Sequence, residues 1–164
     1  MEASERFLRG AFAEVGFPLS DAETEAFMAY LRELKAWNAR FNLTGIGEER
    51  EIVRTLFAES LLYALACDFS TPCRVVDIGS GAGFPGVPLK IKFPEIALTL
   101  VESTGKKAAF LKHIIRTLAL RQTSCVSVHT SKLKDDPAFV GAFDVAVTRG
   151  TGPLHRLVPQ VLPL

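Results

Sequence analysis

The chain has 164 residues, 48% of them hydrophobic, and a formal net charge of +1. This length suits one domain with a buried core and a small additional unit, and it excludes a second large domain. Three cysteines without CxxC spacing, Cys67, Cys73 and Cys125, argue against a disulfide framework and against a zinc site. No apolar run reaches the length of a membrane span, and the first residues lack a signal-peptide pattern. We therefore expect a soluble, cytoplasmic protein without a membrane partner.

The first part of the chain is expected to be helical. Apolar residues recur there at spacings of three and four, which is the period of a helix with one buried face. Ser20 and Glu23 form a capping-box pattern, which marks the start of the longest of these helices. Together the helices predict an N-terminal helical cap over residues 1–70. The three expected helices cover residues 7–15, 20–41 and 49–66.

From residue 74 onward the pattern changes to alternating strands and helices. Alternation at this spacing predicts an α/β fold with a doubly wound parallel sheet, here over residues 71–164. The expected strands cover residues 75–78, 97–101, 124–129 and 143–148, the helices between them cover 85–93 and 106–120, and a further helix follows the fourth strand.

A glycine-rich turn, Gly79 to Gly86, follows the first expected strand. Such a turn offers backbone N–H groups and the positive end of a helix dipole to a ligand, as nucleotide sites do. Gly81, Gly83 and Gly86 satisfy the GxGxxG pattern of dinucleotide-binding proteins. The longer pattern Asp-x-Gly-x-Gly-x-Gly, which begins at Asp77, is the first motif of S-adenosylmethionine (AdoMet) methyltransferases.

Two acidic residues help to choose between these cofactors. Asp77, two positions before the first glycine, suits a ligand that carries an α-ammonium group and would repel a pyrophosphate. Glu102 ends the second expected strand, 23 positions beyond Gly79, where a carboxylate can accept both ribose hydroxyls. Because both cofactors contain a ribose, Glu102 does not separate them. The segment favours a methyltransferase over a dehydrogenase and leaves the dehydrogenase open.

Charge is distributed unevenly along the chain. Residues 1–60 hold eleven acidic and seven basic side chains, whereas residues 103–134 hold seven basic side chains and no acidic one. A positive field of this kind is typical of a nucleic-acid-binding face, and it is equally typical of a helix with an ordinary solvated face. Phe110 is the single aromatic residue among these charges, so base stacking there is not indicated.

Six motifs of the chain resemble one family, the bacterial small-subunit rRNA guanine-N7 methyltransferases, also called RsmG or glucose-inhibited division protein B. The resemblance covers about residues 20–155. It implies AdoMet as cofactor and methylation of one guanosine at N7 in 16S rRNA, either in naked RNA or in the ribosomal subunit. The motifs lie at residues 38–44 (NARFNLT), 59–61 (ESL), 77–86 (DIGSGAGFPG), 100–103 (LVES), 106–111 (KKAAFL) and 143–149 (FDVAVTR).

The resemblance also implies a set of site residues. Glu102 matches the ribose carboxylate, Thr130 and Ser131 match the pair beside the adenine ring, and Arg149 matches an arginine that lines the methyl-transfer cleft. The cofactor-binding candidates are Asp77, Gly79, Ser80, Gly81, Gly83, Phe84, Glu102, Ser103, Thr130, Ser131 and Arg149. The RNA-binding candidates are Asn42, Lys106, Lys107, Lys112 and Arg116.

We assign no general base and no metal site. Guanine N7 carries a lone pair and no proton, so its methylation needs no base, and catalysis can rest on alignment of the reacting groups. Arg149 is the one catalytic candidate, and its alternative is a structural pairing with Asp144 or with a helix end. Asn42 has an alternative too, as the cap or turn residue of a loop.

One departure limits the expectation. A sheet of this class continues with a fifth strand and an antiparallel hairpin, which have no counterpart in the sequence. We therefore expect a core that is incomplete at its C-terminus, with the fourth strand as an apolar, unstable edge.

A noncatalytic AdoMet- or nucleotide-binding module that docks on RNA and an NAD-dependent oxidoreductase remain the alternative functions. A monomer is favoured.

Overall fold

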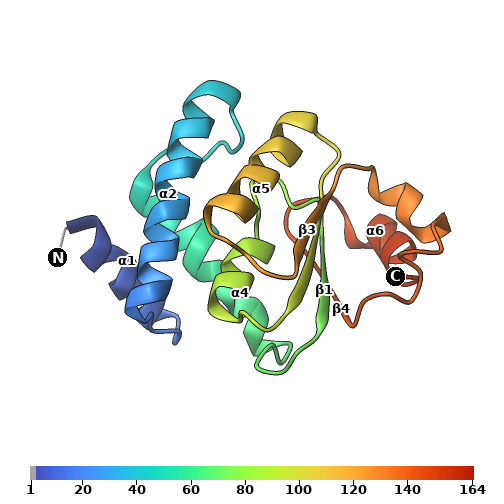
Figure 1. Ribbon diagram of the computed structural model, residues 1–164, viewed down its shortest axis with the longest axis horizontal. Helices are drawn as coiled ribbons and strands as arrows, with labels where there is room; N and C mark the ends of the chain where they lie inside the picture. The colour runs from blue at the N-terminus through green and yellow to red at the C-terminus, as the bar shows by residue number, and fades with distance from the viewer. Residues whose placement is uncertain (1–2) are drawn as a thin grey trace.

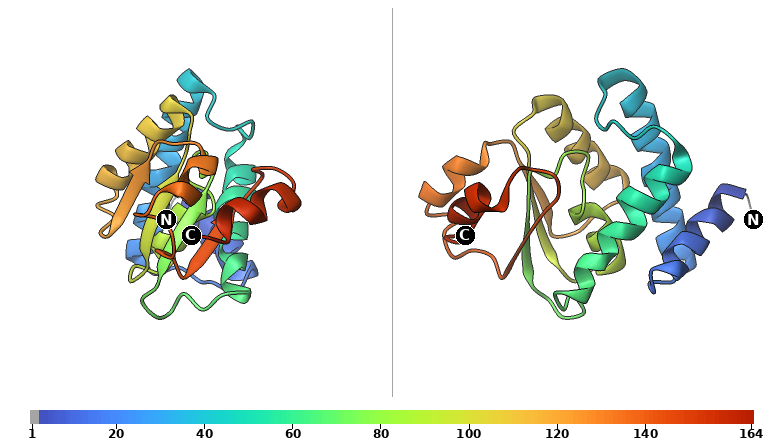
Figure 2. Two further views of the ribbon diagram at one scale, coloured as in Figure 1. Left: turned by 90° about the vertical axis from the view of Figure 1, so that its right-hand side faces the viewer. Right: turned by 180° about the vertical axis from the view of Figure 1, so that it is seen from behind.

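The computed structural model describes residues 3–164, which form three layers and a helical cap (Figure 1). A parallel sheet of four strands in the order β3-β2-β1-β4 is the middle layer. Helices α4 and α5 cover the face toward the cap, and η3 and α6 cover the other face (Figure 2). The strands are β1 (Arg74–Ile78), β2 (Ala97–Val101), β3 (Thr123–Val126) and β4 (Val145–Thr148), and the helices of the two outer layers are α4 (Gly86–Lys92), α5 (Gly105–Thr117), η3 (Thr130–Asp135) and α6 (Leu154–Val161).

The cap begins with two regular helices, α1 (Ala3–Glu14) and α2 (Asp21–Phe41). The capping box predicted from the sequence is present: the Ser20 hydroxyl accepts from the Glu23 amide, and the Glu23 carboxylate accepts from the Ser20 amide. Helix α2 ends in Asn42, which has a left-handed backbone with φ of 49°. The first two predicted helices are therefore confirmed.

The third predicted helix forms, but not as one regular α-helix. The segment starts as a short α-helix, widens to a π-helix and then tightens to a 3₁₀-helix, over α3 (Glu49–Glu51), η1 (Ile52–Phe57) and η2 (Ala58–Leu65). At the junction, the Ser60 hydroxyl donates to the Leu56 carbonyl at 2.5 Å. A side chain that enters the hydrogen-bond ladder changes the winding of a helix, which apolar spacing alone does not predict.

The strand register brings four chain segments to one edge of the sheet. Ile78, the last residue of β1, pairs with Val101 of β2 and with Thr148 of β4. Val101 in turn pairs with Val126, the last residue of β3. Since β1 connects to β2 on one side and the chain returns to β4 on the other, the strand order reverses beside β1. Ligands of open α/β sheets bind in the crevice at such a reversal, outside the carboxyl ends of the strands.

Several predicted boundaries are wrong by two or three residues. Strand β3 ends at Val126 rather than at residue 129, and α5 ends at Thr117, after which Ala119 adopts a left-handed turn. Strand β4 begins at Val145 because Phe143 donates its amide to Leu164 and not to β1. The main strand pattern, including β2 at residues 97–101, is confirmed.

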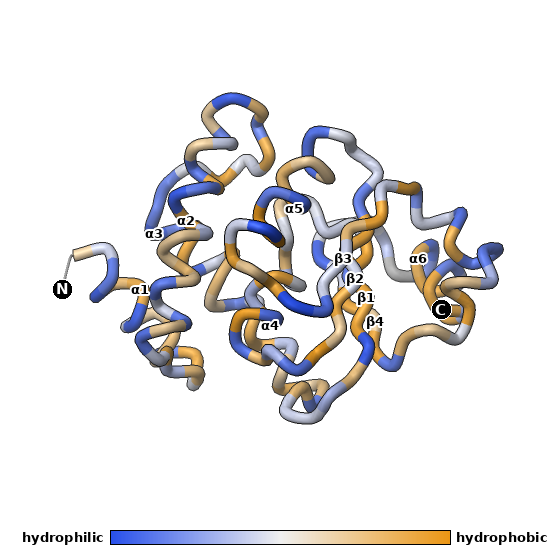
Figure 3. Tube along the Cα trace, in the orientation of Figure 1, coloured by the Kyte–Doolittle hydropathy of each residue, from blue (hydrophilic) through white to orange (hydrophobic). Residues whose placement is uncertain are grey.

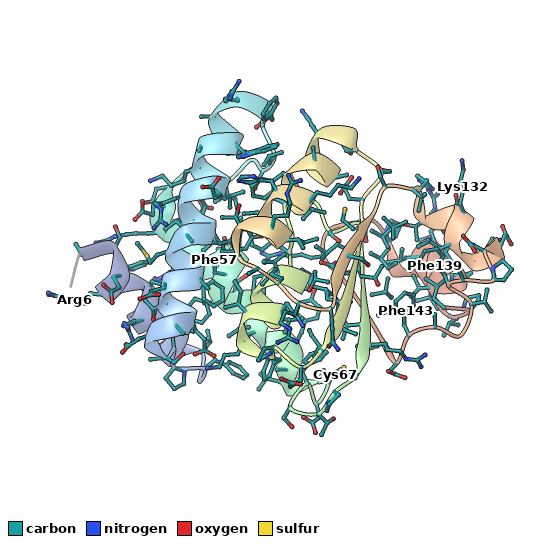
Figure 4. All side chains as sticks on the ribbon, viewed as in Figure 1. Arg6, Phe57, Cys67, Lys132, Phe139 and Phe143 are labelled. Carbon is teal, nitrogen blue, oxygen red and sulfur yellow. The ribbon has the colours of Figure 1, made fainter. Side chains whose placement is uncertain are left out.

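One buried cluster joins the cap to the sheet. It contains Phe27 and Tyr30 of α2, Phe57 of η1, and Leu98 and Leu100 of β2. The Tyr30 and Phe57 rings stack with their centroids 4.9 Å apart. Phe57 is labelled at this junction in Figure 4. In Figure 3 the strands of the sheet are coloured mainly as hydrophobic residues. The cap therefore shares its core with the sheet.

The other face of the sheet has a smaller cluster, formed by Val76, Ile78, Val101, Leu133 and Leu164. Within the described residues, β4 pairs with β1 alone and is an edge of the sheet. In residues 3–164, none of the helices is both long and apolar enough to cross a bilayer.

Candidate nucleotide site at the carboxyl edge of the sheet

The register places three of the predicted site residues side by side. Gly79, Glu102 and Arg149 each follow directly after the last residue of β1, β2 and β4, and those last residues are paired. Thr130 and Ser131 lie farther along the same edge, at the start of η3 after β3. The structure therefore places Gly79, Glu102 and Arg149 at the strand-order reversal.

The glycine turn has the left-handed backbone that glycine favours. Gly79, Gly81 and Gly83 have φ of 68°, 59° and 103°. The amides of Gly83 and Phe84 both donate to the Ser80 carbonyl, which closes the turn. An L-residue at any of these three positions would be strained.

Ser80 is used to build this turn. Its amide donates to the Val101 carbonyl at 2.9 Å, and its hydroxyl donates to the Asp77 carbonyl at 2.9 Å. The side chain is buried, with 1% of its surface exposed. These contacts favour a supporting role for Ser80 over the direct cofactor contact that the sequence suggests.

Gly83 and Phe84 face the cap. A Cβ on Gly83 would lie 2.6 Å from the Tyr30 hydroxyl oxygen and 2.8 Å from a Val87 methyl group, so glycine is required there for packing. The Tyr30 hydroxyl donates to the Ala82 carbonyl at 2.5 Å, and the Tyr30 ring stacks on Phe84 at 5.6 Å between centroids. Helix α2 thus holds the turn directly. The sequence did not reveal this contact.

The Asp77 carboxyl group lies beneath the turn and is fully buried. One oxygen, Oδ2, accepts from the Gly86 amide at 2.9 Å, and a Cβ on Gly86 would lie 2.6 Å from that oxygen. The other oxygen, Oδ1, has no hydrogen-bond partner in the described part of the chain. Oδ2 therefore fixes the end of the turn, and the predicted contact with a ligand's ammonium group would fall to Oδ1.

Burial raises the pKa of Asp77 to about 7. The hydrogen bond from the Gly86 amide and the nearby Ser80 hydroxyl oppose this rise, and the negative charge of Glu102 adds to it. A buried carboxyl with one unpaired oxygen gains from a proton or from a donor brought by a ligand. Asp77 is the most strongly perturbed acid of this edge, which is typical of a functional site.

Glu102 connects the turn to the helix that follows β2. Its Oε2 accepts from the Gly81 amide at 2.9 Å, and its Oε1 accepts from the Thr104 amide at 2.7 Å. The side chain is buried, with 6% exposed. Its neighbour Ser103 is exposed. Both oxygens of the predicted ribose carboxylate are thus engaged by backbone amides in this structure.

Arg149 points to the cap. One of its amino groups, Nη1, donates to the Thr55 carbonyl of η1, and the other, Nη2, lies 3.5 Å from the Glu59 carboxylate of η2. The alternative pairing with Asp144 is wrong, because Asp144 binds Arg74 at 2.8 Å at the opposite end of the strands. Tyr63, also on η2, donates its hydroxyl to the Thr148 carbonyl at 2.6 Å.

The segment after Arg149 covers the first glycine of the turn. A Cβ on Gly79 would overlap the methyl group of Thr151. The hydroxyl oxygens of Thr151 and Thr148 are 2.5 Å apart, and Thr148 also donates to the Ile78 carbonyl. Gly79 therefore allows β1 and the segment after β4 to approach closely.

The predicted adenine pair sits on η3. The Ser131 hydroxyl lies 2.8 Å from Nδ1 of His129, and the Ser131 amide donates to the same nitrogen at 3.3 Å. Thr130 is half-buried and Ser131 is exposed. Within residues 3–164, no group of three His, Cys, Asp or Glu side chains could hold a metal ion.

The basic candidates lie on the solvent side of α5, which buries Phe110, Leu111 and Ile114. Lys106, Lys112 and Arg116 are exposed, and Lys107 is half-buried. Asn42 is exposed at the end of α2, where its left-handed backbone gives it the turn role considered from the sequence. Nearby, Asn38 Oδ1 accepts from the Thr44 amide at 2.9 Å, so this part of the NARFNLT motif holds the loop in place.

Sequence reasoning missed three residues of this edge. Tyr30, Thr55 and Tyr63 are cap residues that contact the ends of β1 and β4. A signal for two of them was present, because Thr55, Glu59 and Tyr63 recur every four residues along a mainly apolar segment. Their partners became evident with the tertiary structure.

Comparison with known proteins identifies relatives of one kind. The profile of the family described as rRNA small subunit methyltransferase G matches residues 23–164. Ribosomal RNA small subunit methyltransferase G of Roseiflexus castenholzii is 49% identical over 149 residues, which are 91% of this chain and 63% of that protein. Proteins of the same name from Chloroflexus aggregans and Halalkalibacterium halodurans are 41% and 36% identical over 98% and 100% of this chain, and over 67% and 68% of their own lengths.

Solved structures share the fold. A protein-L-isoaspartate O-methyltransferase superposes with a TM-score of 0.58 at 16% identity, over 88% of this chain and 47% of that one. A structure described as a putative S-adenosyl-L-methionine-dependent methyltransferase from Methanococcus maripaludis superposes with a TM-score of 0.54 at 19% identity, over 69% and 54% of the two chains.

The match leaves part of the relatives uncovered. This chain spans about 63% of the length of the two Roseiflexus relatives. Within that span the identity is high, and the matched profile includes the glycine turn, Glu102 and Arg149. The chain belongs to the rRNA small subunit methyltransferase G family.

Proposed function

We propose that this chain binds AdoMet at the carboxyl edge of its sheet and transfers the methyl group to N7 of one guanosine in small-subunit (16S) rRNA. The observation that carries the proposal is the register of β1, β2 and β4, which sets the glycine turn, Glu102 and Arg149 side by side in a member of this family. The same family membership gives no support to an NAD-dependent oxidoreductase.

The residues at this edge fit the cofactor. The turn brings the backbone of three left-handed glycines to this edge, and Asp77 Oδ1 is a buried acceptor without a partner in the described residues. We infer direct contacts for Gly79, Gly81, Glu102, Ser103, Thr130, Ser131 and Arg149, and supporting roles for Asp77, Ser80, Gly83 and Phe84.

In this proposal Glu102 binds the ribose hydroxyls of the cofactor. Its carboxylate satisfies the Gly81 and Thr104 amides in the structure, and ribose hydroxyls would share or replace those contacts. A carboxylate has about four acceptor positions, so two backbone bonds leave room for hydroxyl donors.

The chemistry needs little from the protein beyond alignment. When bound, AdoMet supplies a sulfonium methyl group: the N7 lone pair forms the new N–C bond, the C–S electrons remain on sulfur as a thioether, and the positive charge moves to the guanine ring. No proton leaves N7, so no general base is required. Holding the reacting atoms in line contributes about 7–11 kcal/mol in well-oriented systems.

RNA is the proposed partner of the basic face of α5. Lys106, Lys107, Lys112 and Arg116 lie on the helix that begins beside Glu102, and Asn42 is at the end of α2, which packs against α5. Such charges bind phosphates and position the target.

We infer that residues 1–70 act as the cap and residues 71–164 as the cofactor-binding core. We also infer that the substrate is rRNA in the small ribosomal subunit, which places the protein in the cytoplasm. All proposed contacts come from one chain, which fits a monomer.

Labelled methyl transfer tests the proposal. The chain is incubated with methyl-labelled AdoMet and either deproteinised 16S rRNA or intact small subunits, and the labelled nucleoside is identified after digestion. We expect label in 7-methylguanosine. Saturable AdoMet binding without transfer to either RNA would instead favour the noncatalytic module, and binding of NADH with no binding of AdoMet would overturn the cofactor assignment.

A further inference from the structure

The third helical segment of the cap contacts the end of β4 through residues spaced by four. Thr55 accepts a hydrogen bond from Arg149 through its carbonyl, Glu59 lies 3.5 Å from the same guanidinium, and Tyr63 donates to Thr148 at 2.6 Å. These three residues of η1 and η2 therefore contact two successive residues, Thr148 and Arg149, at the end of β4.

The irregular winding of this segment explains why it can do so. Thr55 lies in the π-helix η1, and Glu59 and Tyr63 lie in the 3₁₀-helix η2. Next to the junction, the carbonyls of Thr55 and Leu56 both accept from side chains, those of Arg149 and Ser60. Single π turns in helices are frequent at functional sites.

Charges at the glycine turn also affect Tyr63. Burial raises the pKa of Tyr63, the charge of Arg149 lowers it and the charge of Asp77 raises it, so the tyrosine lies within electrostatic range of both groups. Arg149 and Glu59 have side chains that are 30% and 50% exposed. An ion pair with this exposure adds little stability, so its main effect is to orient the arginine.

We propose that Glu59 and Tyr63 are positioning residues for Arg149. They hold the guanidinium against the cap at the end of β4, and Thr55 in the π-helix supplies a backbone acceptor for it. A guanidinium has five N–H donors, and the contacts with Thr55 and Glu59 use two of its nitrogens, which leaves other donors for a ligand. The catalytic part of this inference rests on the proposed function.

The first test reads the arginine itself and requires no activity. Nitrogen-15 NMR of the guanidinium of Arg149, assigned with Arg149→Lys, reports how freely its amino groups rotate. We expect slow rotation in the unmodified chain, faster rotation in Glu59→Gln, and no change in Glu51→Gln, which removes an exposed carboxylate from the same segment. Rotation in the unmodified chain as fast as in Glu59→Gln would overturn the positioning role.

The second test is a double-mutant cycle in methyl transfer. Because small misplacements of a positioning group reduce rates strongly, we expect Glu59→Gln to lower kcat by about tenfold, with a smaller change in KM for AdoMet. In an Arg149→Gln background the same change should have less than about a twofold effect, because a residue that acts through Arg149 has no further role there. Tyr63→Phe should follow the same pattern.

The outcomes separate this inference from the proposed function. An active chain whose Glu59 and Arg149 effects multiply independently would contradict the inference and leave the proposed function standing. A chain that binds no AdoMet and transfers no methyl group, but shows the expected NMR pattern, would overturn the proposed function and keep the positioning of Arg149. Thermal unfolding of each variant shows whether it is folded.

Discussion

At the scale of single residues, Asp77 carries the clearest electrostatic consequence. Its carboxyl is fully buried and its pKa is raised from 3.8 to about 7. Between these pH values the folded chain keeps a proton that the unfolded chain releases. The contribution of Asp77 to the free energy of unfolding should therefore fall as pH rises from about 4 to about 7, by at most about 1.4 kcal/mol per pH unit, and level off above that.

Asp77→Asn tests this dependence. Asparagine keeps an oxygen for the Gly86 amide but does not titrate, so the decline between pH 4 and pH 7 should become flatter in chemical denaturation. The exposed Glu25→Gln on α2 serves as the control and should leave the decline unchanged. Equal pH profiles for Asp77→Asn and the unmodified chain would show that Asp77 titrates normally.

Glu102 combines a structural role with the proposed ribose role. Glu102→Ala leaves the Gly81 and Thr104 amides without their acceptor, and hydrogen bonds to a charged group contribute about 1.5–3 kcal/mol each. We expect AdoMet affinity to fall by at least about tenfold in calorimetric titration, with a lower unfolding temperature. Glu95→Ala, an exposed acid just before β2, is the matched control. Unchanged affinity in Glu102→Ala would remove it from the cofactor site.

At the scale of elements, sequence patterns predicted those helix starts and strands that depend on neighbouring residues. The Ser20 capping box and the apolar run at residues 97–101 each specify their element through near neighbours, and both are confirmed. The winding of residues 49–65 was not predictable from apolar spacing, because the π and 3₁₀ turns accompany hydrogen bonds from Arg149 and Ser60 into the backbone. The contact from Arg149 comes from a distant segment, whereas that from Ser60 is local.

Part of the candidate site was predictable from the local sequence, and part depended on the tertiary fold. The glycine pattern predicted the left-handed turn and its place after a strand, because only the local backbone is involved. It could not separate glycines that serve a ligand from glycines that serve packing. Gly83 and Gly86 are required by Tyr30 and Asp77, whose positions depend on the tertiary fold.

Tyr30 gives the prediction at this scale. Tyr30→Phe keeps the ring stacks with Phe57 and Phe84 but removes the donor to the Ala82 carbonyl, which would lose the partner that Tyr30 provides. We expect the free energy of unfolding to fall by about 1–3 kcal/mol and AdoMet affinity to weaken as the turn loosens. Phe27→Leu, in the same aromatic group, should lower stability through lost packing and leave affinity unchanged. Equal affinities for Tyr30→Phe and the unmodified chain would show that the turn holds its shape without this bond.

At the scale of the whole molecule, the cap belongs to the site. Tyr30 holds the turn after β1, and the row of Thr55, Glu59 and Tyr63 holds the end of β4. The cap also shares its buried cluster with the sheet. Charge is distributed unevenly between the cap and α5. Acidic residues outnumber basic ones in the cap, whereas α5 carries basic residues and no acidic one. An approaching polyanion is therefore attracted to the α5 side of the site and repelled from the cap.

This division leads to a prediction about RNA. Replacement of both Lys106 and Lys107 by alanine removes two positive charges beside the start of α5, and we expect weaker association with rRNA and unchanged AdoMet affinity. In filter binding over a range of salt concentrations, the slope of log affinity against log salt should become shallower by about 0.7–0.9 per lysine that contacts a phosphate.

The matched control removes two charges from the cap. Arg6→Ala combined with Arg32→Ala lowers the net charge equally, and both arginines are exposed, Arg6 at the far end from the sheet in Figure 4. If net charge alone governed binding, the two double variants would behave alike. If α5 is the RNA-binding face, the lysine variant alone should lose slope. An unchanged slope in the lysine variant would mean that these side chains face solvent and that the RNA approaches from elsewhere.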